Sequence, residues 1–387
     1  MPTYFACRWS FLFMVLVVVR AATAGGAAAA EPVVHDPALK LELFAAAPDI
    51  VTPIGATFDA KGRLLVIESQ THERDKNYQG PPKDRIRMLD DPGHTGHATR
   101  FRTFYEGTEF TMSLARGQEG WIYVATRMKI FRIRDTKGDD VADEEQELLH
   151  LETKGNYPHN GLSGLCFDQH GDLYFGIGEN LGQAWKLVGK DGSSLHGAGE
   201  GGVFRCHPDG SGLTRVAIGL WNPFGICVDP EGRVFAVDND PDGRPPCRLV
   251  QIVPTGDYGF NFKYGRSGKN PLQAWTGELP GTLPMVAGTG EAPCAVLPYH
   301  GSLWSTSWGD HRIERFKLVP FGASFKAKLE NVVEGDEHFR PVGLAIAPDG
   351  SLYFTDWVDK SYPVHGKGRV WRLSWVKPPP ADDWPKA

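Results

Sequence analysis

The sequence lacks most of the short motifs that identify common enzyme classes. It has no G-x-S-x-G segment, no G-x-G-x-x-G segment that opens a helix after a strand, and no Walker A motif. These absences argue against a serine hydrolase with a nucleophile elbow and against nucleotide-dependent chemistry. The six cysteines form no C-x-x-C or C-x-x-C-H spacing, so covalent haem attachment and a cysteine-type zinc site are not expected.

Large patches of one charge and long helical patterns are also absent. The 41 lysines and arginines and the 47 acids leave a net charge of −6 without a basic cluster, so no nucleic-acid partner is expected. No long amphipathic helix pattern occurs. Beyond the N-terminus, no apolar run approaches the ~20 residues that cross a bilayer, so we expect no transmembrane helix there.

The N-terminus has the layout of a secretory signal. Arg8 precedes the apolar run Phe11–Val19, and small residues follow at Ala22–Ala24 and Ala27–Ala30. A charged, a short apolar and a small-residue segment in this order are typical of a signal peptide, which we predict over residues 1–30. An uncleaved anchor is the alternative. The protein is therefore expected in the periplasm or outside the cell.

The cysteines outside this signal, which contains Cys7, number five. Cys166 and Cys227 lie inside apolar runs and are expected to be buried fillers. Cys206 and Cys247 lie in predicted loops, where an oxidising compartment would allow them to pair, although the spacing does not establish a disulfide.

Turns are what the sequence has in quantity, with 46 glycines and 29 prolines and no collagen period. Six times, an apolar run, a polar turn that ends in glycine and a second apolar run follow one another, which is typical of a β-hairpin. The turn glycines are Gly62, Gly120, Gly171, Gly232, Gly301 and Gly350. Further strands follow most hairpins, so each repeat has room for one four-stranded blade.

These repeats predict an all-β chain, a six-bladed β-propeller of four-stranded antiparallel blades over residues 31–377. Residues 378–387 are expected to be a tail, either a linker or a frayed end. The strand Leu39–Ala45 is expected to join the last blade, because this closes the ring and hides its edge. A pair of β-sandwiches is the alternative, and the regular recurrence of one hairpin disfavours it.

Polar residues recur where the hairpin strands end. Six residues after their turn glycines stand Glu68, Asp238 and Asp356, and period two gives them one orientation at one rim. The ends of other strands reach the same rim, with Glu179, His159, Asn160, Asn222 and Arg340. We therefore expect a ligand site at the mouth of the central channel. Strand ends are also polar simply because loops are solvated, which is the alternative.

The turn Val237–Gly243 contains an unusual density of oxygen side chains, at Asp238, Asn239, Asp240 and Asp242. A hard cation such as Ca²⁺ is bound by such groups together with backbone carbonyls. We predict a calcium site with Asp238, Asp240 and Asp242 as ligands. Turn chemistry alone also favours these residues.

His159 is the candidate for the reactive group, since imidazole is the usual general base near neutral pH. Its place beside Asn160 at the start of the third hairpin favours catalysis or binding over a structural role. Gly161 and Gly164 follow it, and they indicate close backbone approach, either of a ligand or of neighbouring strands at a tight blade centre.

Four segments carry a resemblance to a known family: HNGLSGLCFDQHGDLYFGIGEN, GLWNPFGICVDPEGRVFAVDNDPDG, GDYGFNFKYG and RPVGLAIAPDGSLYFTDW. They are similar to segments of the soluble pyrroloquinoline quinone (PQQ)-dependent glucose, aldose and sorbosone dehydrogenases. More closely, the chain resembles the bacterial propellers that are classed as membrane-bound dehydrogenases. The resemblance covers roughly residues 39–375 and implies a six-bladed propeller that binds PQQ with Ca²⁺ and oxidises a sugar.

The resemblance also implies roles for single residues. His159 would accept the proton of the substrate hydroxyl, and Asn160, Asn222 and Arg340 would lie beside the cofactor. The Asp238–Asp242 turn matches the calcium region. Three cations of the family pattern are replaced: Trp221 stands in place of an arginine, Val342 in place of a second arginine, and no lysine is found in the SWGDHRIERF segment.

The sequence thus predicts a PQQ- and Ca²⁺-dependent dehydrogenase for a sugar or sugar-derived alcohol. Because the chain has no haem motif, it would need a separate electron acceptor. Two alternatives stay open. One is a calcium-dependent lactone hydrolase, in which Glu68, Asp238 and Asp356 hold a central ion that polarises the carbonyl. The other is a propeller that binds a carbohydrate or a protein without catalysis, since the fold does not choose between them.

Overall fold

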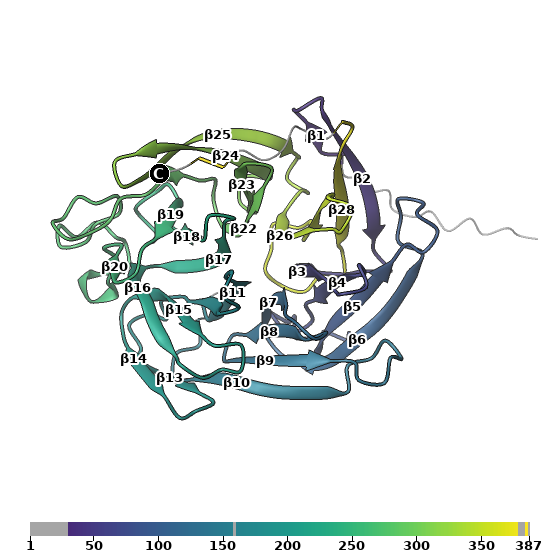
Figure 1. Cartoon of the computed structure of the whole chain (residues 1–387), viewed down its shortest axis with the longest axis horizontal. Helices are drawn as coiled ribbons and strands as arrows, with labels where there is room; N and C mark the ends of the chain where they lie inside the picture. The colour runs from purple at the N-terminus through teal and green to yellow at the C-terminus, as the bar shows by residue number, and fades with distance from the viewer. Residues whose placement is uncertain (1–29, 158–159, 378–383, 386–387) are drawn as a thin grey trace, which may run out of the picture.

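Six β-sheets surround a central axis in the computed structural model (Figure 1). The structure describes residues 30–157, 160–377 and 384–385. Within this part of the chain the regular elements are 28 strands and one short 3₁₀ helix, η1 (Phe262–Tyr264). The all-β, six-bladed propeller predicted from the repeats is confirmed.

Each blade is built on four antiparallel strands, and its first strand faces the central channel. Blade 1 comprises β3 (Pro53–Phe58), β4 (Leu64–Glu68), β5 (Asp84–Asp90) and β6 (Arg100–Thr108). Blade 2 comprises β7 (Thr111–Arg116), β8 (Ile122–Thr126), β9 (Lys129–Arg134) and β10 (Glu144–Thr153). Blade 3 comprises β11 (Leu162–Phe167), β12 (Leu173–Ile177), β15 (Gly201–Cys206) and β16 (Thr214–Leu220).

The remaining blades follow the same order. Blade 4 comprises β17 (Asn222–Val228), β18 (Val234–Asn239), β19 (Arg248–Ile252) and β21 (Ala287–Gly288). Blade 5 comprises β22 (Pro293–Tyr299), β23 (Ser302–Ser307), β24 (Arg312–Phe321) and β25 (Ser324–Glu334). Blade 6 comprises β26 (Pro341–Ile346), β27 (Leu352–Asp356), β28 (Arg369–Trp375) and the early strand β2 (Leu39–Ala46).

Three blades carry additional strands that the repeat pattern did not predict. The hairpin of β13 (Trp185–Gly189) and β14 (Ser194–Gly197) leaves blade 3 and pairs with β10 of blade 2. The two-residue strand β20 (Gly256–Asp257) extends blade 3 in parallel, and β1 (Val33–Val34) extends blade 5. These additions bridge neighbouring blades at the outside of the ring.

The ring is closed by β2, which pairs antiparallel with β28 from Leu39 opposite Trp375 to Ala46 opposite Arg369. This is the pairing predicted for Leu39–Ala45. It joins the N-terminal and C-terminal parts of the propeller in one sheet, so that blade 6 depends on both and its outer edge is covered.

The hydrophobic core is divided among the interfaces between blades. One cluster of buried side chains fills each interface, and members of the clusters are Ile67 with Phe131, Tyr123 with Phe175, Ala217 with Val250, Phe235 with Phe316, Trp304 with Phe354, and Tyr353 with Val66. Because the second strand of each blade is packed on both faces, strands such as β4 (LLVIE) are buried along their whole length. Burial of each large side chain contributes about 1.5–3 kcal/mol.

The glycines near the start of the inner strands show whether they make room for a ligand or for neighbouring strands, which the sequence left open. Gly164 has φ +67°, and a Cβ there would lie 3.0 Å from the carbonyl oxygen of Phe224 in the next blade. A Cβ on Gly343 would meet the carbonyl oxygen of Ile54 more closely still, at 2.3 Å. These glycines therefore serve close packing of the inner strands at the centre of the ring.

Two points that the sequence left open concern the cysteines and the tail. Cys206 and Cys247 are both buried and unpaired, so they do not form a disulfide. Of the predicted tail the structure describes residues 384 and 385, where Trp384 packs into the cluster of Phe235 and Phe316 and Arg233 donates a 2.7 Å hydrogen bond to the Pro385 carbonyl. The predicted signal, except for residue 30, lies outside the described residues. Among those residues, no helix is long and apolar enough to cross a membrane.

Candidate functional site

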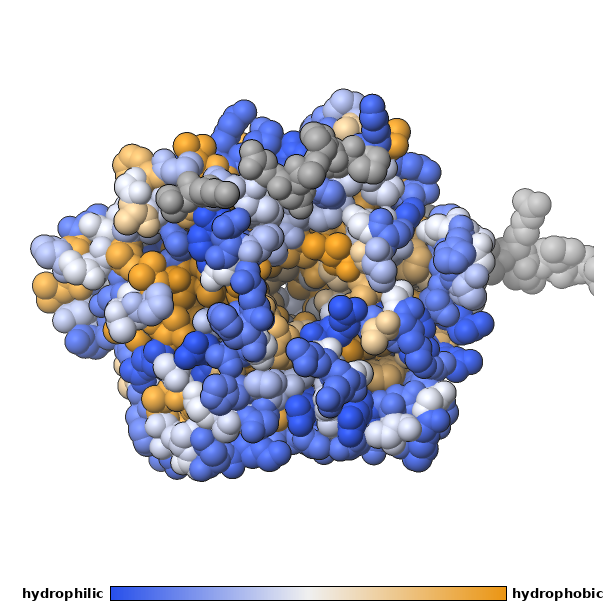
Figure 2. Space-filling view, in the orientation of Figure 1, coloured by the Kyte–Doolittle hydropathy of each residue, from blue (hydrophilic) through white to orange (hydrophobic). Residues whose placement is uncertain are grey.

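A channel runs along the axis of the ring between the six inner strands. The hollow at the centre of the ring and the hydrophobic residues along its wall are visible in Figure 2. At the rim where the second strands end, the channel contains a cavity of about 130 Å³. At the other rim it opens into a wider space of about 600 Å³, lined by residues of the inner strands such as Phe58, Phe167 and Leu297.

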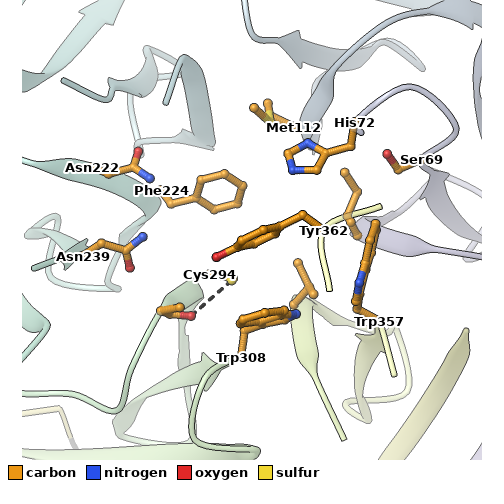
Figure 3. Close-up of a pocket in the computed structure, with 13 residues that line it drawn as sticks. Ser69, His72, Met112, Asn222, Phe224, Asn239, Cys294, Trp308, Trp357 and Tyr362 are labelled. Atoms are coloured by element: carbon orange, nitrogen blue, oxygen red, sulfur yellow. Dashed lines mark hydrogen bonds between the residues drawn. The ribbon is translucent and has the colours of Figure 1, made fainter. Parts of the chain in front are cut away.

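The walls of the smaller cavity are aromatic. Trp308 and Tyr362 stack with 5.3 Å between ring centroids and 10° between planes. The ring of His72 meets Trp357 edge-on at 6.4 Å and Tyr362 at 6.2 Å. Figure 3 shows these rings, with Phe224 opposite, turned toward one space. A flat or ring-shaped ligand would find stacking surfaces here.

The polar groups of the cavity lie at its edges. Asn222 opens β17, Asn239 ends β18 and Ser69 follows β4, so each comes from a strand end at this rim. The Cys294 thiol donates a 3.3 Å hydrogen bond to the Ala292 carbonyl. Among the described residues that line the cavity, none is a lysine, an arginine or a carboxylate. The cavity therefore offers neutral hydrogen-bonding groups beside aromatic faces.

His72 is the titratable ring of this cavity that the sequence did not single out. It lies in the loop between β4 and β5, outside any strand pattern. Burial, assisted by the charge of Arg127, lowers the pKa of His72 from 6.5 to about 4. The imidazole is therefore neutral at physiological pH, a form in which one ring nitrogen can donate a hydrogen bond and the other can accept one. Its one sequence signal is its position four residues after the strand-end Glu68.

The predicted channel-mouth acids do lie at this rim, but they are bound inside their own blades. Asp238 is fully buried and accepts hydrogen bonds from the backbone N–H of Trp221 at 3.0 Å and of Asn222 at 2.7 Å. Its second oxygen accepts from Arg248 Nε at 3.0 Å and Nη2 at 2.9 Å. Asp238 therefore joins the first, second and third strands of blade 4 through its hydrogen bonds and its ion pair.

Asp356 and Glu68 repeat this arrangement in blades 6 and 1. Asp356 accepts from the Arg340 backbone N–H at 2.8 Å and from Arg369 Nε at 2.7 Å. Glu68 accepts from the Val51 backbone N–H at 3.0 Å, with Arg87 Nη1 3.5 Å away. In all three blades an arginine of the third strand stands directly opposite the acid. None of these carboxylates lines the cavity, which corrects the expectation that they face the channel.

Arg340 is also buried beneath the rim. Its Nη1 donates to the carbonyls of Trp308 at 2.8 Å and Gly309 at 3.0 Å, and its Nε donates to the Glu337 carbonyl at 3.1 Å. Nη2 is buried without a hydrogen-bond partner in the structure. The guanidinium thus holds the loop that carries Trp308 in place. Arg340 is not among the residues that line the cavity.

Glu179 and Asn160 lie at the same rim in blade 3, and neither residue lines the cavity. The Glu179 carboxylate accepts from the backbone N–H of Leu181 at 2.7 Å and of Gly182, while burial raises its pKa above the ordinary value. Asn160 donates to the Glu179 carbonyl. Both residues are buried and hold this turn together. His159, the predicted base, lies outside the described residues.

The three aspartates grouped as a calcium site are separated by the fold. Asp238 binds Arg248, as above, and the exposed Asp242 forms a 2.6 Å ion pair with Arg266. Asp240 instead approaches Cys247 and Glu291. The structure therefore does not bring the three carboxylates around one ion, because each faces a different neighbour.

Comparison with solved structures finds the same fold in proteins that act on sugars. A Thermus thermophilus protein described as an oxidoreductase (glucose dehydrogenase) is 21% identical, with a TM-score of 0.61 over 87% of this chain and 100% of its own. The PQQ-bound aldose sugar dehydrogenase of Streptomyces coelicolor is 19% identical, with a TM-score of 0.59 over 87% of this chain and 98% of its own.

A calcium-containing structure of a Trichoderma reesei carbohydrate-active enzyme of family AA12 is 15% identical, with a TM-score of 0.63 over 92% of this chain and 100% of its own. At these identities the likeness concerns the fold. A comparison with curated proteins finds no match. Residues 27–258 match the family model described as a domain of unknown function, DUF7133. The chain therefore belongs to the DUF7133 family, here folded as a six-bladed propeller of the kind found in soluble PQQ-dependent sugar dehydrogenases.

Proposed function

We propose that the cavity at the channel mouth binds a sugar or a sugar-derived alcohol. The observation that carries this proposal is the combination of the stacked rings of Trp308 and Tyr362 with the neutral amides of Asn222 and Asn239. The C–H face of a sugar ring packs against an aromatic face, while its hydroxyl groups require donors and acceptors at the edge. The fold shared with sugar dehydrogenases supports the same class of ligand.

Asn222, Asn239 and the neutral His72 would hold hydroxyl groups at the edges of the cavity. Trp308, Tyr362 and Phe224 would hold the ring and exclude water from it. A neutral imidazole can accept the proton of a bound hydroxyl group, so His72 is a second candidate for the base beside His159. The described lining contains no carboxylate and no cation, which suits an uncharged ligand.

Dehydrogenation with PQQ and Ca²⁺ is the second candidate function, and the shared fold favours it. The described lining does not fit the cofactor, however. PQQ carries three carboxylates, and charge-assisted hydrogen bonds to such groups are worth about 1.5–3 kcal/mol each. Trp221 and Val342 replace two family arginines, Val342 lines the cavity, and Arg340 donates to carbonyls beneath Trp308. The described lining therefore offers no cation to the carboxylates of the quinone.

Two further parts of the proposal rest on the sequence. The N-terminal signal pattern supports export to the periplasm or the medium. If the protein oxidises its ligand, the electrons need an acceptor, and no C-x-x-C-H haem motif occurs in residues 1–387. The lactone-hydrolase alternative finds no support in the site, because Glu68, Asp238 and Asp356 are bound within separate blades.

The proposal is tested by titrating the protein with a panel of aldoses and sugar alcohols. Tryptophan fluorescence and calorimetry measure the binding. We expect saturable binding that Trp308→Leu weakens by about tenfold, which corresponds to the loss of one stacking contact. Trp375→Leu is the matched control, because Trp375 is half-buried like Trp308 but packs against Tyr299 and His300 outside the cavity. Equal affinities in the two variants would overturn the proposal, as would the absence of binding across the panel.

The second candidate is tested separately. PQQ is added with Ca²⁺, and reduction of an artificial electron acceptor is measured with the same sugars. Turnover that His159→Gln and His72→Gln each reduce would support dehydrogenation. Sugar binding without PQQ binding or dye reduction would leave the first proposal standing and remove the second.

A further inference from the structure

A small cluster of donor atoms lies beside the cavity and takes no part in the proposed sugar site. Asp240 follows β18, Cys247 precedes β19, and Glu291 lies between β21 and β22. The Cys247 Sγ is 3.2 Å from Asp240 Oδ1 and 3.6 Å from Glu291 Oε2, and the three donor atoms all lie within 4.8 Å of one another. Three separate segments are therefore folded so that one thiol and two carboxylates converge.

The negative charge of this cluster is not balanced by the protein. In the part of the chain that the structure describes, neither Asp240 nor Glu291 makes an ion pair, whereas acids close to them in the sequence or in space do. Asp238 pairs with Arg248, Asp242 with Arg266, and Asp310 with Arg312. A bound cation would supply the missing charge.

The spacing of the donor atoms matches a small tetrahedral site. Zinc–sulfur bonds of about 2.3 Å and zinc–oxygen bonds of about 2.0–2.2 Å place neighbouring sulfur and oxygen ligands about 3.6 Å apart. The observed separations of 3.2 and 3.6 Å are close to this value. Calcium is a weaker fit, since it takes six to eight oxygen ligands and does not favour sulfur.

We propose that Asp240, Cys247 and Glu291 form a binding site for a divalent transition-type cation, with Zn²⁺ as the representative. The thiol loses its proton to solvent when the metal binds, and the thiolate and the two carboxylates become three protein ligands. Three protein ligands leave the fourth tetrahedral position to water. This site differs from the predicted calcium site in its ion and in two of its three ligands.

The cluster also lies next to the channel-mouth cavity. Asn239 and Ala292, which both line the cavity, are the immediate sequence neighbours of Asp240 and Glu291. The oxygen of the Asn239 side chain is buried and has no hydrogen-bond partner in the structure. Cys247 itself is only 1% exposed, while Glu291 is exposed. The metal would therefore enter from the Glu291 side and would be held at the blade 4 edge of the cavity.

Cobalt is the probe for this site, because a thiolate bound to Co²⁺ gives an absorption band in the near ultraviolet that carboxylates and waters alone do not give. The full-length, metal-free protein under reducing conditions is titrated with Co²⁺. We expect the band to saturate at one Co²⁺ per chain. It should disappear when Zn²⁺ is then added and displaces the bound Co²⁺. Zn²⁺ should also raise the melting temperature, since it binds the folded state.

The matched variants are Cys247→Ser and Cys294→Ser, since both cysteines lie at this rim and only Cys247 belongs to the cluster. We expect Cys247→Ser to lose the band and Cys294→Ser to keep it. Glu291→Gln changes an exposed side chain, so it should fold normally while binding Co²⁺ at least tenfold more weakly. A band that Cys247→Ser retains, or saturation without any thiolate band, would overturn the site. The readout does not depend on sugar binding, so it stands or falls separately from the proposed function.

Discussion

The strand-end acids and the cavity between them lie at the same rim, but the acids are charged and paired with arginines, whereas the cavity is lined by uncharged groups. Asp238 and Asp356 are fully buried, and each is neutralised by an arginine of its own blade and by backbone N–H groups. The cavity is lined by rings, amides and a neutral imidazole. Two residues beyond Asp238, Asp240 pairs with no arginine of the described residues and faces a thiol and a second carboxylate.

This difference separates structure from candidate function. A buried carboxylate with all its partners in place holds three strands of a blade together. This structural role accounts for the carboxylate without any contact to a ligand in the channel. The rings and amides that line the cavity lie at strand ends and in the loops of the same rim. The paired acids and arginines of the repeat therefore stabilise the blades, and the cavity-lining groups are the candidates for ligand binding.

The largest effect on stability is expected from Asp238→Ala. The variant leaves the Arg248 guanidinium, which is fully buried and also donates to the carbonyls of Gly219, Tyr258 and Trp275, without its counter-ion. Removal of one partner of a buried ion pair typically costs about 3–5 kcal/mol. Urea unfolding measures the change in the free energy of unfolding. A loss below about 1 kcal/mol, the range of an exposed pair, would show that Asp238 does not lock the blade.

A smaller effect is expected from the protonation of His72. The pKa of this residue is lowered to about 4 in the folded protein by burial and by Arg127, and it is about 6.5 in the unfolded chain. Between these values the unfolded state binds a proton that the folded state does not, so stability falls as the pH is lowered from about 6.5 to about 4, by at most about 3 kcal/mol.

Stability measured across this pH window should therefore depend on pH less steeply in His72→Gln than in the wild type. The His72 resonance in an NMR titration gives the pKa directly. A midpoint at or above the ordinary value of about 6.5 would contradict the neutral imidazole in the cavity.

Glu68→Gln should destabilise the protein by about 2 kcal/mol, because the variant keeps one contact of the carboxylate and loses its charge. The glutamine oxygen can still accept from the Val51 N–H, but the charge that faces Arg85 and Arg87 at 3.9 and 3.5 Å is lost. These arginines are partly exposed, and pairs of this kind are weaker than the buried Asp238 pair. Chemical denaturation of both variants under the same conditions ranks them, and the reverse order would break the comparison.

The smallest effect is expected from Asp242→Ala, which removes an exposed ion pair with Arg266. Exposed pairs contribute between zero and about 1 kcal/mol, and salt screens them. Unfolding measured at low and high salt should show a small loss that shrinks as salt is added. A loss that matches that of Asp238→Ala would mean that this turn is held together by its charges.

The fold was largely predictable because its signals are local. The polar turn ending in Gly171 and the apolar runs on either side of it lie within one short segment, and the same pattern returns in each blade. The closing strand was predictable for a different reason, since the apolar alternation in Leu39–Ala45 needs a partner sheet and the last blade has an open edge. The extra hairpin of β13 and β14 was missed because it pairs with a blade other than its own.

The site was only partly predictable. The register placed Glu68, Asp238 and Asp356 at one rim correctly, but not the direction of their side chains. An arginine opens β19 and β28 and stands opposite Asp238 and Asp356, and this recurrence is the signal that would have indicated locks within the blades. His72, Trp308 and Tyr362 lie in loops, where no period exists from which to place a side chain.

The sequence by itself determined the number of blades, the closure of the ring and the rim at which strand-end polar groups collect. Strand and turn preferences act over a few residues, so each hairpin carries its own instructions. Only the tertiary structure decided which polar groups face a ligand, because that depends on partners far away in the chain. Asp240 meets Glu291 of the following blade junction, and Trp308 of blade 5 stacks on Tyr362 of blade 6. Such contacts arise when the blades pack, and no local pattern encodes them.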